Sequence, residues 1–346
     1  MQTSPLSNLN QRVARASRGL AMTLTTVSAL LLATPSTHAD DSPQQVSAEE
    51  LQAPTRVVTL GTGTPSIDAG RAGTATAVIV NQDQVYLFDA GSGFMQTLGH
   101  FEAEGKRDIF PPTSPNPNAM LPTFLDKLFL THLDSDHILG IPELLLRGWV
   151  LERQQPVRIW GPAGTRTVVD GVVEAYQPDI QHRLGSLPIS EEAPYTGIVE
   201  ELGSDPGTVY QDRYVTVSAF NVDHGSWEQG EAYGYRIEAP DKTIVISGDT
   251  RPSPNLLEHA KGADILLHEV MSVAGMEAMS QDWQNYMLDA HTTTHQLAEI
   301  AREIDPELLV MIHPLFLGAP EEVLLEEMQA AYDGNVVLAD DGDVFE

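Results

Sequence analysis

The stretch that decides the fold is Leu130-Thr131-His132-Leu133-Asp134-Ser135-Asp136-His137, which ends an apolar run and leads into the helical pattern Ile138-Leu139-Gly140-Ile141. It holds four side chains that can bind a metal, namely His132, Asp134, Asp136 and His137. A strand-to-helix turn aims successive side chains into one crevice, so the pattern predicts a metal site there. The alternative is that an aspartate caps the helix and the histidines face solvent.

Three later strand ends carry the same residue types. They are Val222-Asp223-His224-Gly225, Ile246-Ser247-Gly248-Asp249-Thr250 and Met311-Ile312-His313-Pro314. A lone His or a Gly-Asp after a strand is weak evidence, because such residues are common in turns. Their recurrence predicts two divalent ions that share one carboxylate. The candidate ligands are His132, Asp134, Asp136, His137, His224, Asp249 and His313.

From about residue 56 onward, β-branched runs alternate with helical patterns. Strands are predicted at 56–60, 76–80, 85–88, 128–131, 157–160, 215–220, 233–237, 243–246, 264–267 and 308–312. Helices are predicted at 137–148, 164–176, 253–261, 293–304 and 320–332. The early strands lie close together and the later ones alternate with helices, which indicates sheets covered by helices in one α/β (α+β) domain.

Two polar segments interrupt this pattern. Residues 101–123 contain Pro111-Pro112-Thr113-Ser114-Pro115-Asn116-Pro117-Asn118 and predict a surface loop or lid. Residues 178–212 form an acidic insertion, in which Arg183 is the only Lys or Arg.

The composition limits both the chemistry and the partners. Over 346 residues, 19 Lys+Arg stand against 49 Asp+Glu, a net charge of −30 that repels phosphate backbones and anionic membranes. Nucleic acid is therefore not expected as a partner. The chain has no cysteine, so a metal must be held by histidine and carboxylate.

The N-terminus is typical of an export signal. Residues 1–39 place arginines before an apolar run that ends in small residues, which predicts a secretory signal peptide cut after about Ala39 and a periplasmic or secreted protein. An uncleaved membrane anchor is the alternative, although the run is short for a span. Once the signal is cleaved, no membrane contact is expected. Residues 40–54 are polar and predict a disordered lead-in to a domain at 55–346.

Taken in order, the four strand-end motifs resemble the metallo-β-lactamase superfamily. Leu60-Gly61-Thr62-Gly63-Thr64-Pro65, Leu87-Phe88-Asp89-Ala90-Gly91, Leu267-His268-Glu269 and His291-Thr292-Thr293 resemble its ribonuclease Z and arylsulfatase-like branch. The resemblance extends from about residue 56 to 340. It implies a single-domain αββα sandwich with the metals at one edge, and hydrolysis by a metal-bound hydroxide.

The resemblance also implies roles for individual residues. His132, position 134 and His224 would hold the first metal, Asp136, His137 and His313 the second, and Asp249 would lie between them. Two zinc ions are expected, with manganese or iron as alternatives, because the family has His where this chain has the harder ligand Asp134. The catalytic residues would be Asp136 and His291, the latter oriented by Glu269 as general acid. His291 and His295 would otherwise only cap the helix near Thr293.

The substrate is constrained by charge. Ribonuclease Z enzymes grip tRNA with a flexible basic arm, whereas the comparable insertion here is acidic, which argues against tRNA. A small phosphodiester or aryl sulfate ester is the first hypothesis. The alternatives are a carboxylic ester or lactone on the same metals, or a non-catalytic binding protein whose metal site Asp134 has made degenerate. A homodimer remains open.

Overall fold

The alternation of side chains along strand β3 (Gln84–Phe88) explains how the chain builds its layers. In a computed structural model, which describes residues 45–111, 122–186 and 194–346, Val85 and Leu87 enter one apolar core. Tyr86 and Phe88 point the opposite way and enter a second core. A strand buried on both faces needs a layer on each side, so this sheet lies between helices and another sheet.

The described strands form two seven-stranded sheets. The first has the order β14-β1-β2-β3-β4-β5-β6 and the second the order β13-β12-β11-β10-β9-β8-β7. The remaining strands of the first sheet are β1 (Arg56–Gly61), β2 (Ala75–Val80), β4 (Lys127–Phe129), β5 (Val157–Gly161), β6 (Gly197–Glu201) and β14 (Val344–Phe345). Those of the second are β7 (Gly207–Gln211), β8 (Thr216–Asn221), β9 (Tyr233–Glu238), β10 (Thr243–Ile246), β11 (Ile265–Met271), β12 (Leu308–Leu315) and β13 (Val336–Leu338).

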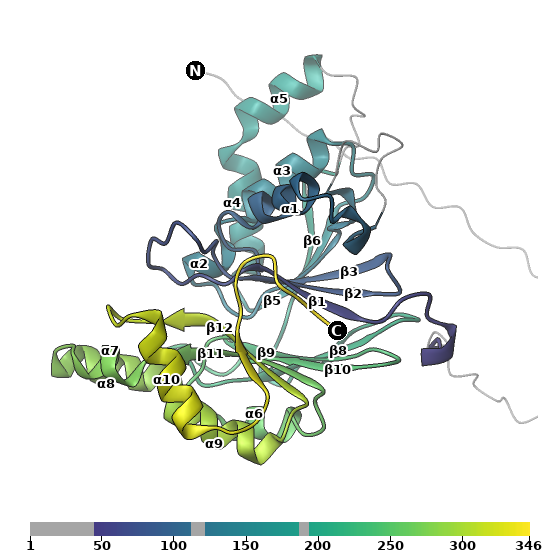
Figure 1. The fold of residues 1–346 in the computed structure, drawn as a ribbon. Helices are drawn as coiled ribbons and strands as arrows, with labels where there is room; N and C mark the ends of the chain where they lie inside the picture. The colour runs from purple at the N-terminus through teal and green to yellow at the C-terminus, as the bar shows by residue number, and fades with distance from the viewer. Residues whose placement is uncertain (1–44, 112–121, 187–193) are drawn as a thin grey trace, which may run out of the picture. The chain divides into compact units, whose positions relative to one another are not determined.

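Helices cover the outer face of each sheet (Figure 1). On the first sheet lie α1 (Phe94–Ala103), α3 (Ile141–Val150) and α4 (Thr165–Ala175), and α5 (Gln177–Ser186) extends from α4 away from the sheet. On the second lie α6 (Pro254–His259), α9 (Thr294–Ile304) and α10 (Glu321–Ala331). The predicted αββα sandwich is therefore confirmed.

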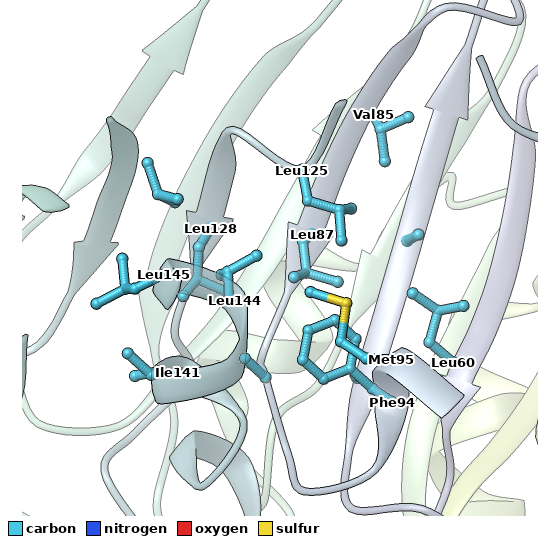
Figure 2. Packing of buried hydrophobic residues seen from close by; sticks show 14 of the residues in the cluster. Leu60, Val85, Leu87, Phe94, Met95, Leu125, Leu128, Ile141, Leu144 and Leu145 are labelled. Atoms are coloured by element: carbon cyan, nitrogen blue, oxygen red, sulfur yellow. The ribbon is translucent and has the colours of Figure 1, made fainter. Parts of the chain in front are cut away.

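Each interface between layers has its own apolar core. Figure 2 shows the one under the helices of the first sheet, where Leu87 and Leu128 of the strands meet Phe94, Ile141 and Leu144 of α1 and α3. Burial of side chains of this size is worth about 1.5–3 kcal/mol each relative to exposure. This packing fixes the strands whose ends carry the candidate ligands.

The carboxyl ends of the central strands meet at one edge. In the first sheet β3, β4 and β5 are parallel, and in the second β10, β11 and β12 are parallel. The short helix α2 (Ser135–Ile138) follows β4 at this edge. Open α/β sheets place their functional loops at such an edge.

Several predicted boundaries differ from the structure. The helix predicted at 137–148 is two helices, α2 and α3, because the backbone of Gly140 packs against Ala90 and Gly91. The loop predicted over 101–123 is wrong at its start, since α1 continues to Ala103 and a 3-10 turn follows at Arg107–Ile109. Its proline-rich centre, 112–121, lies outside the described residues.

The acidic segment 178–212 is also more regular than predicted. Most of α5 and the strands β6 and β7 lie within it, and these strands end one side of each sheet. Residues 187–193 lie outside the described part of the chain. The two strands are therefore part of the sheets, and not an insertion that interrupts the pattern of strands and helices.

The N-terminal predictions have a mixed outcome. The signal peptide at 1–39 lies outside the described residues. Of the lead-in at 40–54, residues 45–54 are not disordered: a 3-10 turn at Ala48–Glu50 is closed by a capping box at Ser47, and Val46 N donates to Arg213 O at 2.9 Å. Among the described helices, none combines the length and apolarity that a membrane span requires.

Candidate metal centre

The predicted ligands converge from four strand ends. His132, Asp134, Asp136 and His137 follow β4, His224 follows β8, Asp249 follows β10, and His313 lies within β12. Three overlapping groups have ligand atoms within 4.8 Å of one another: His132, His224 and Asp249; Asp136, His137 and His313; and Asp249, His291 and His313. Asp249 belongs to two of these groups, one with His132 and His224 and one with His291 and His313.

The first group includes Asp134 as well. Its Oδ2 lies 3.2 Å from His224 Nε2 and 3.4 Å from His132 Nε2. The nearby His132 ring and the hydrogen bond with His224 lower the pKa of Asp134 well below its usual range. The carboxylate thus faces both histidines of this group, although 43% of the side chain is exposed. The helix-cap alternative does not hold, because the Asp134 side chain makes no capping hydrogen bond.

The second group is buried. His313 Nε2 lies 3.1 Å from Asp136 Oδ2, and His137 Nε2 lies 3.6 Å from the same oxygen. The two oxygens of Asp249 approach from the other side, with Oδ1 3.5 Å from His137 Nε2 and Oδ2 3.4 Å from His313 Nε2. Asp249 is thus positioned to share its carboxylate between the two groups.

The far ring nitrogens of three histidines are occupied by acceptors. His137 Nδ1 donates to Asp89 Oδ2 at 2.8 Å, and His224 Nδ1 donates to Ala290 O at 2.9 Å. Thr131 Oγ1 donates to Asp89 Oδ2 and so accepts from His132 Nδ1 at 2.9 Å. With Nδ1 of each ring bonded to its acceptor, Nε2 is the nitrogen that faces the centre and can bind a metal, as in carboxylate-histidine-metal arrangements.

Two backbone features aim the ligands. His313 is the extra residue in the β11–β12 register, where Glu269 pairs with Ile312 and Val270 with Pro314, and its φ of 47° is left-handed. A bulge of this kind turns a side chain out of the strand's alternation. Gly91 provides close packing, because a Cβ there would lie 2.3 Å from Asp136 O.

The cluster favours positive charge. Burial alone would lower the pKa of His137, but Asp249 and Asp89 raise it well above the usual value. Burial likewise opposes protonation of His224, but its hydrogen bond to the Asp134 carboxylate and the charge of Asp249 raise its pKa to about 9. Carboxylates that hold imidazoles in their charged form also attract cations.

The residues fit a pair of divalent ions. Among the described side chains, His132 Nε2, His137 Nε2 and Asp249 Oδ1 are buried without a hydrogen-bond partner. Buried polar atoms without a partner are costly, and a cation at the centre would satisfy all three. The imidazole and carboxylate set suits zinc and also tolerates manganese or iron.

Glu269 and His291 lie beside the centre. His291 Nδ1 is 3.2 Å from Glu269 Oε1, which also accepts from Thr250 N and Thr292 N. Burial lowers the pKa of His291 to about 4, whereas burial and the charge of Asp249 raise the pKa of Glu269. Burial thus opposes the protonated form of His291, while Glu269 Oε1 lies within hydrogen-bonding distance of its Nδ1.

Burial also distinguishes several other residues. Trp149, Trp160 and Phe94 are core residues, whereas Trp227 is half-buried with its ring 6.4 Å from that of His132. Asp89 supports the ligand loop through its hydrogen bonds with Thr131 and His137. His295 is exposed and makes no capping contact, since Thr293 caps α9. Sequence reasoning missed Thr131 and the carbonyl of Ala290, for which no motif gives a signal.

Known proteins match most of the chain. The family model described as Beta-lactamase superfamily domain matches residues 84–314. A ribonuclease Z from Mycobacterium sp. (strain KMS) is 30% identical over 289 residues, covering 82% of this chain and 93% of that protein.

Solved structures agree. The metallo-beta-lactamase fold protein YhfI from Bacillus subtilis superposes with a TM-score of 0.61 at 18% identity, covering 85% of this chain and 99% of that one. The short form of human tRNase Z gives a TM-score of 0.58 at 22% identity, covering 84% and 98%. At these identities the two structures show a shared fold.

Proposed function

Since this chain belongs to the metallo-β-lactamase superfamily and is a metal-dependent hydrolase of that fold, we propose that it hydrolyses small phosphodiesters with two divalent metal ions. The observation that carries the proposal is the placement of Asp249 between two His/Asp groups. One carboxylate shared by two ions is the arrangement that two-metal hydrolysis of phosphate esters requires.

Each ligand has a place in this proposal. His132, Asp134 and His224 would hold the first ion, Asp136, His137 and His313 the second, and Asp249 both. Bound ions would supply Lewis-acid stabilisation of the phosphate charge and activation of water. Asp89, Thr131 and the carbonyl of Ala290 fix the rings, so that little reorganisation is needed when the substrate binds.

His291 is proposed to deliver a proton to the leaving oxygen. Its Nδ1 is held by Glu269 Oε1, and its ring centroid lies 5.1 Å from that of His224 and 6.0 Å from that of His313. This leaves Nε2 as the atom that can meet a substrate. Glu269, whose pKa is raised by burial, is a source of the proton that His291 passes on.

The relatives favour a phosphodiester as the substrate. The negative net charge of this protein favours a small substrate. The relatives are named as ribonucleases, which cleave a phosphodiester in a polymer. A protein with a net charge of −30 repels a polyanion. We therefore propose that this protein cleaves the same type of bond as its relatives, but in a small molecule and not in RNA. Aryl sulfates, carboxylic esters and lactones are the competing substrates.

Metal analysis joined to a substrate panel tests the proposal. The purified protein is expected to hold about two divalent ions per chain. It is expected to turn over bis(4-nitrophenyl) phosphate faster than 4-nitrophenyl sulfate, 4-nitrophenyl acetate or a lactone. Preference for any of the other three would replace the phosphodiester. Metal binding with no turnover of any would favour the binding-protein alternative.

The cellular location and assembly are proposals of the same kind. The leader pattern at 1–39 supports export to the periplasm or medium. Cell fractionation with N-terminal sequencing of the mature protein tests this, and a retained N-terminus in the cytoplasm would contradict it. Light scattering at several concentrations would distinguish a monomer from a homodimer.

A further inference from the structure

Helix α8 (Gln281–Ala290) is held by very little of the protein. Ala290 is the one fully buried residue of this helix. Figure 1 shows α7 (Val273–Glu277) and α8 projecting beside the second sheet. Two large aromatic side chains stand on this exposed helix: Trp283 is 54% and Tyr286 53% exposed. Their rings meet edge to face with centroids 5.7 Å apart.

The aromatic pair continues the face by which α8 contacts the protein. At about 100° per residue, Trp283, Tyr286 and Ala290 lie within one third of the helix circumference. Met287 is on the same side and packs on the small cluster of Met271, Met276 and Leu315. Other described residues thus cover this face of α8 at its C-terminal end. They leave it exposed at Trp283 and Tyr286.

That face leads to the metal centre. Ala290 O accepts the hydrogen bond that orients His224, and a Cβ on Gly225 would lie 3.5 Å from the Ala290 Cβ. Asp289 O accepts from Gly225 N at 3.1 Å, and Asp289 pairs with Arg251. The rise of 1.5 Å per residue places Tyr286 about 6 Å and Trp283 about 10.5 Å before Ala290 along the helix.

His291 follows Ala290 directly, so the helix that carries the aromatic pair ends at the proposed proton donor. Large exposed aromatics cost solvation free energy unless something packs on them, and flat apolar groups stack on them well. The leaving group is the part of the substrate that must approach His291. The residues that bind the leaving group are therefore expected near the end of the metal centre where His291 lies.

We infer that Trp283 and Tyr286 form a subsite for an aromatic leaving group of the ester substrate. This deepens the proposed function and rests on it. In the hydrolysis, water adds to phosphorus, the bond from phosphorus to the aryl oxygen breaks, and that oxygen leaves with a proton as a phenol. The pair would hold the ring during this step, with the phosphate at the metal centre.

Equilibrium binding tests the subsite without relying on turnover. Isothermal titration of the metal-loaded full chain with 2-naphthyl phosphate is compared with methyl phosphate. Trp283→Ala and Tyr286→Ala are each expected to weaken naphthyl phosphate about 10-fold and to leave methyl phosphate unchanged. Trp283→Phe should recover most of the affinity, and Tyr176→Ala, a change to an exposed aromatic on the first sheet's helices, should have no effect.

The outcomes separate this inference from the proposed function. Equal losses for both ligands, or no loss for either, would overturn the subsite, even if phosphodiesters are hydrolysed. Selective loss for the naphthyl ligand would support it, even if the hydrolysed bond is another ester. Because both side chains are exposed, the variants should keep the wild-type Tm, and Trp283→Phe guards against a folding defect.

Discussion

The two halves of the metal centre differ in how firmly the protein holds them. The second group is enclosed: the side chains of His137 and His313 are 1% exposed, and Asp89 fixes the His137 ring. In the first group the Asp134 carboxylate is half exposed, and His224 depends on a carbonyl of the projecting helix α8. Preorganised ligands lose less entropy on binding, so the second half should bind its ion more tightly.

This contrast has a structural origin. The second group is built on β12 and on the loop after β4, which Asp89 and Gly91 pack from the neighbouring strand end. The first group closes between that loop and the loop after β8. A site that joins two loops can yield to substitution more easily than one set in a sheet. We therefore expect substitutions in the first half to disturb the metal centre less than substitutions in the second half.

Removing the shared ligand should have the largest effect. Asp249→Ala is expected to abolish hydrolysis and to lose at least one ion, because this carboxylate faces both groups. Metal content by mass spectrometry, together with activity, is the measurement. Retention of two ions with normal turnover would contradict the dinuclear arrangement and with it the comparison of two halves.

Removing His291 should lower the rate of hydrolysis and leave a metal ion bound in both halves of the centre. His291→Ala is expected to slow esters with poor leaving groups by roughly 10²–10⁴-fold, and nitrophenyl esters much less, because only a poor leaving oxygen needs the proton. Metal content should remain at the wild-type level. Equal rate losses for both classes of ester, or loss of an ion, would reassign His291 from proton donor to ligand.

The comparison predicts a selective effect at Asp89. Asp89→Asn removes the charge behind His137 and one acceptor of the Thr131 and His137 network. The second half should lose about 10–100-fold in affinity, as is usual when a ligand's supporting carboxylate is changed. Stepwise titration against a chelator can resolve the two ions. Asp83→Asn, at an exposed position, is the matched control. If Asp89→Asn instead lowered the metal affinity of the first half and left that of the second unchanged, Asp89 would support the first half.

The sequence could predict that the candidate ligands converge because each lies after a strand or near its end, where residue type and spacing carry the signal. His313 shows the limit: its motif was visible, but the bulge and left-handed φ that turn it to the centre depend on pairing with β11. Ala290 shows a second limit, because a hydrogen bond accepted by a backbone carbonyl does not depend on the residue type. Helix α8 was not predicted because an exposed helix has no broad apolar stripe to mark it.

The segment 178–212 was misread for a related reason. Its acidic composition suggested a solvated insertion, yet Glu200 accepts from Trp160 Nε1 at 3.1 Å and Glu201 accepts from the backbone of Gly164 and Arg166. At a sheet edge, carboxylates can serve the first turn of a neighbouring helix, and charge alone does not distinguish this from a loop.

The smallest expected effect concerns Asp134, and it tests the comparison most finely. Asp134 Oδ2 contacts both His132 and His224, so Asp134→His should restore an all-imidazole set without removing the first ion. Imidazole is softer than carboxylate, and the preference for zinc over manganese should rise by about 10-fold or less. Competition between the two metals, read by mass spectrometry, measures this. Asp134→Ala is the control and should weaken the first ion alone, because the second half makes no contact with this side chain among the described residues. If both variants leave metal count and preference unchanged, Asp134 is no ligand, and the half-exposed first site is held by His132, His224 and Asp249 without it.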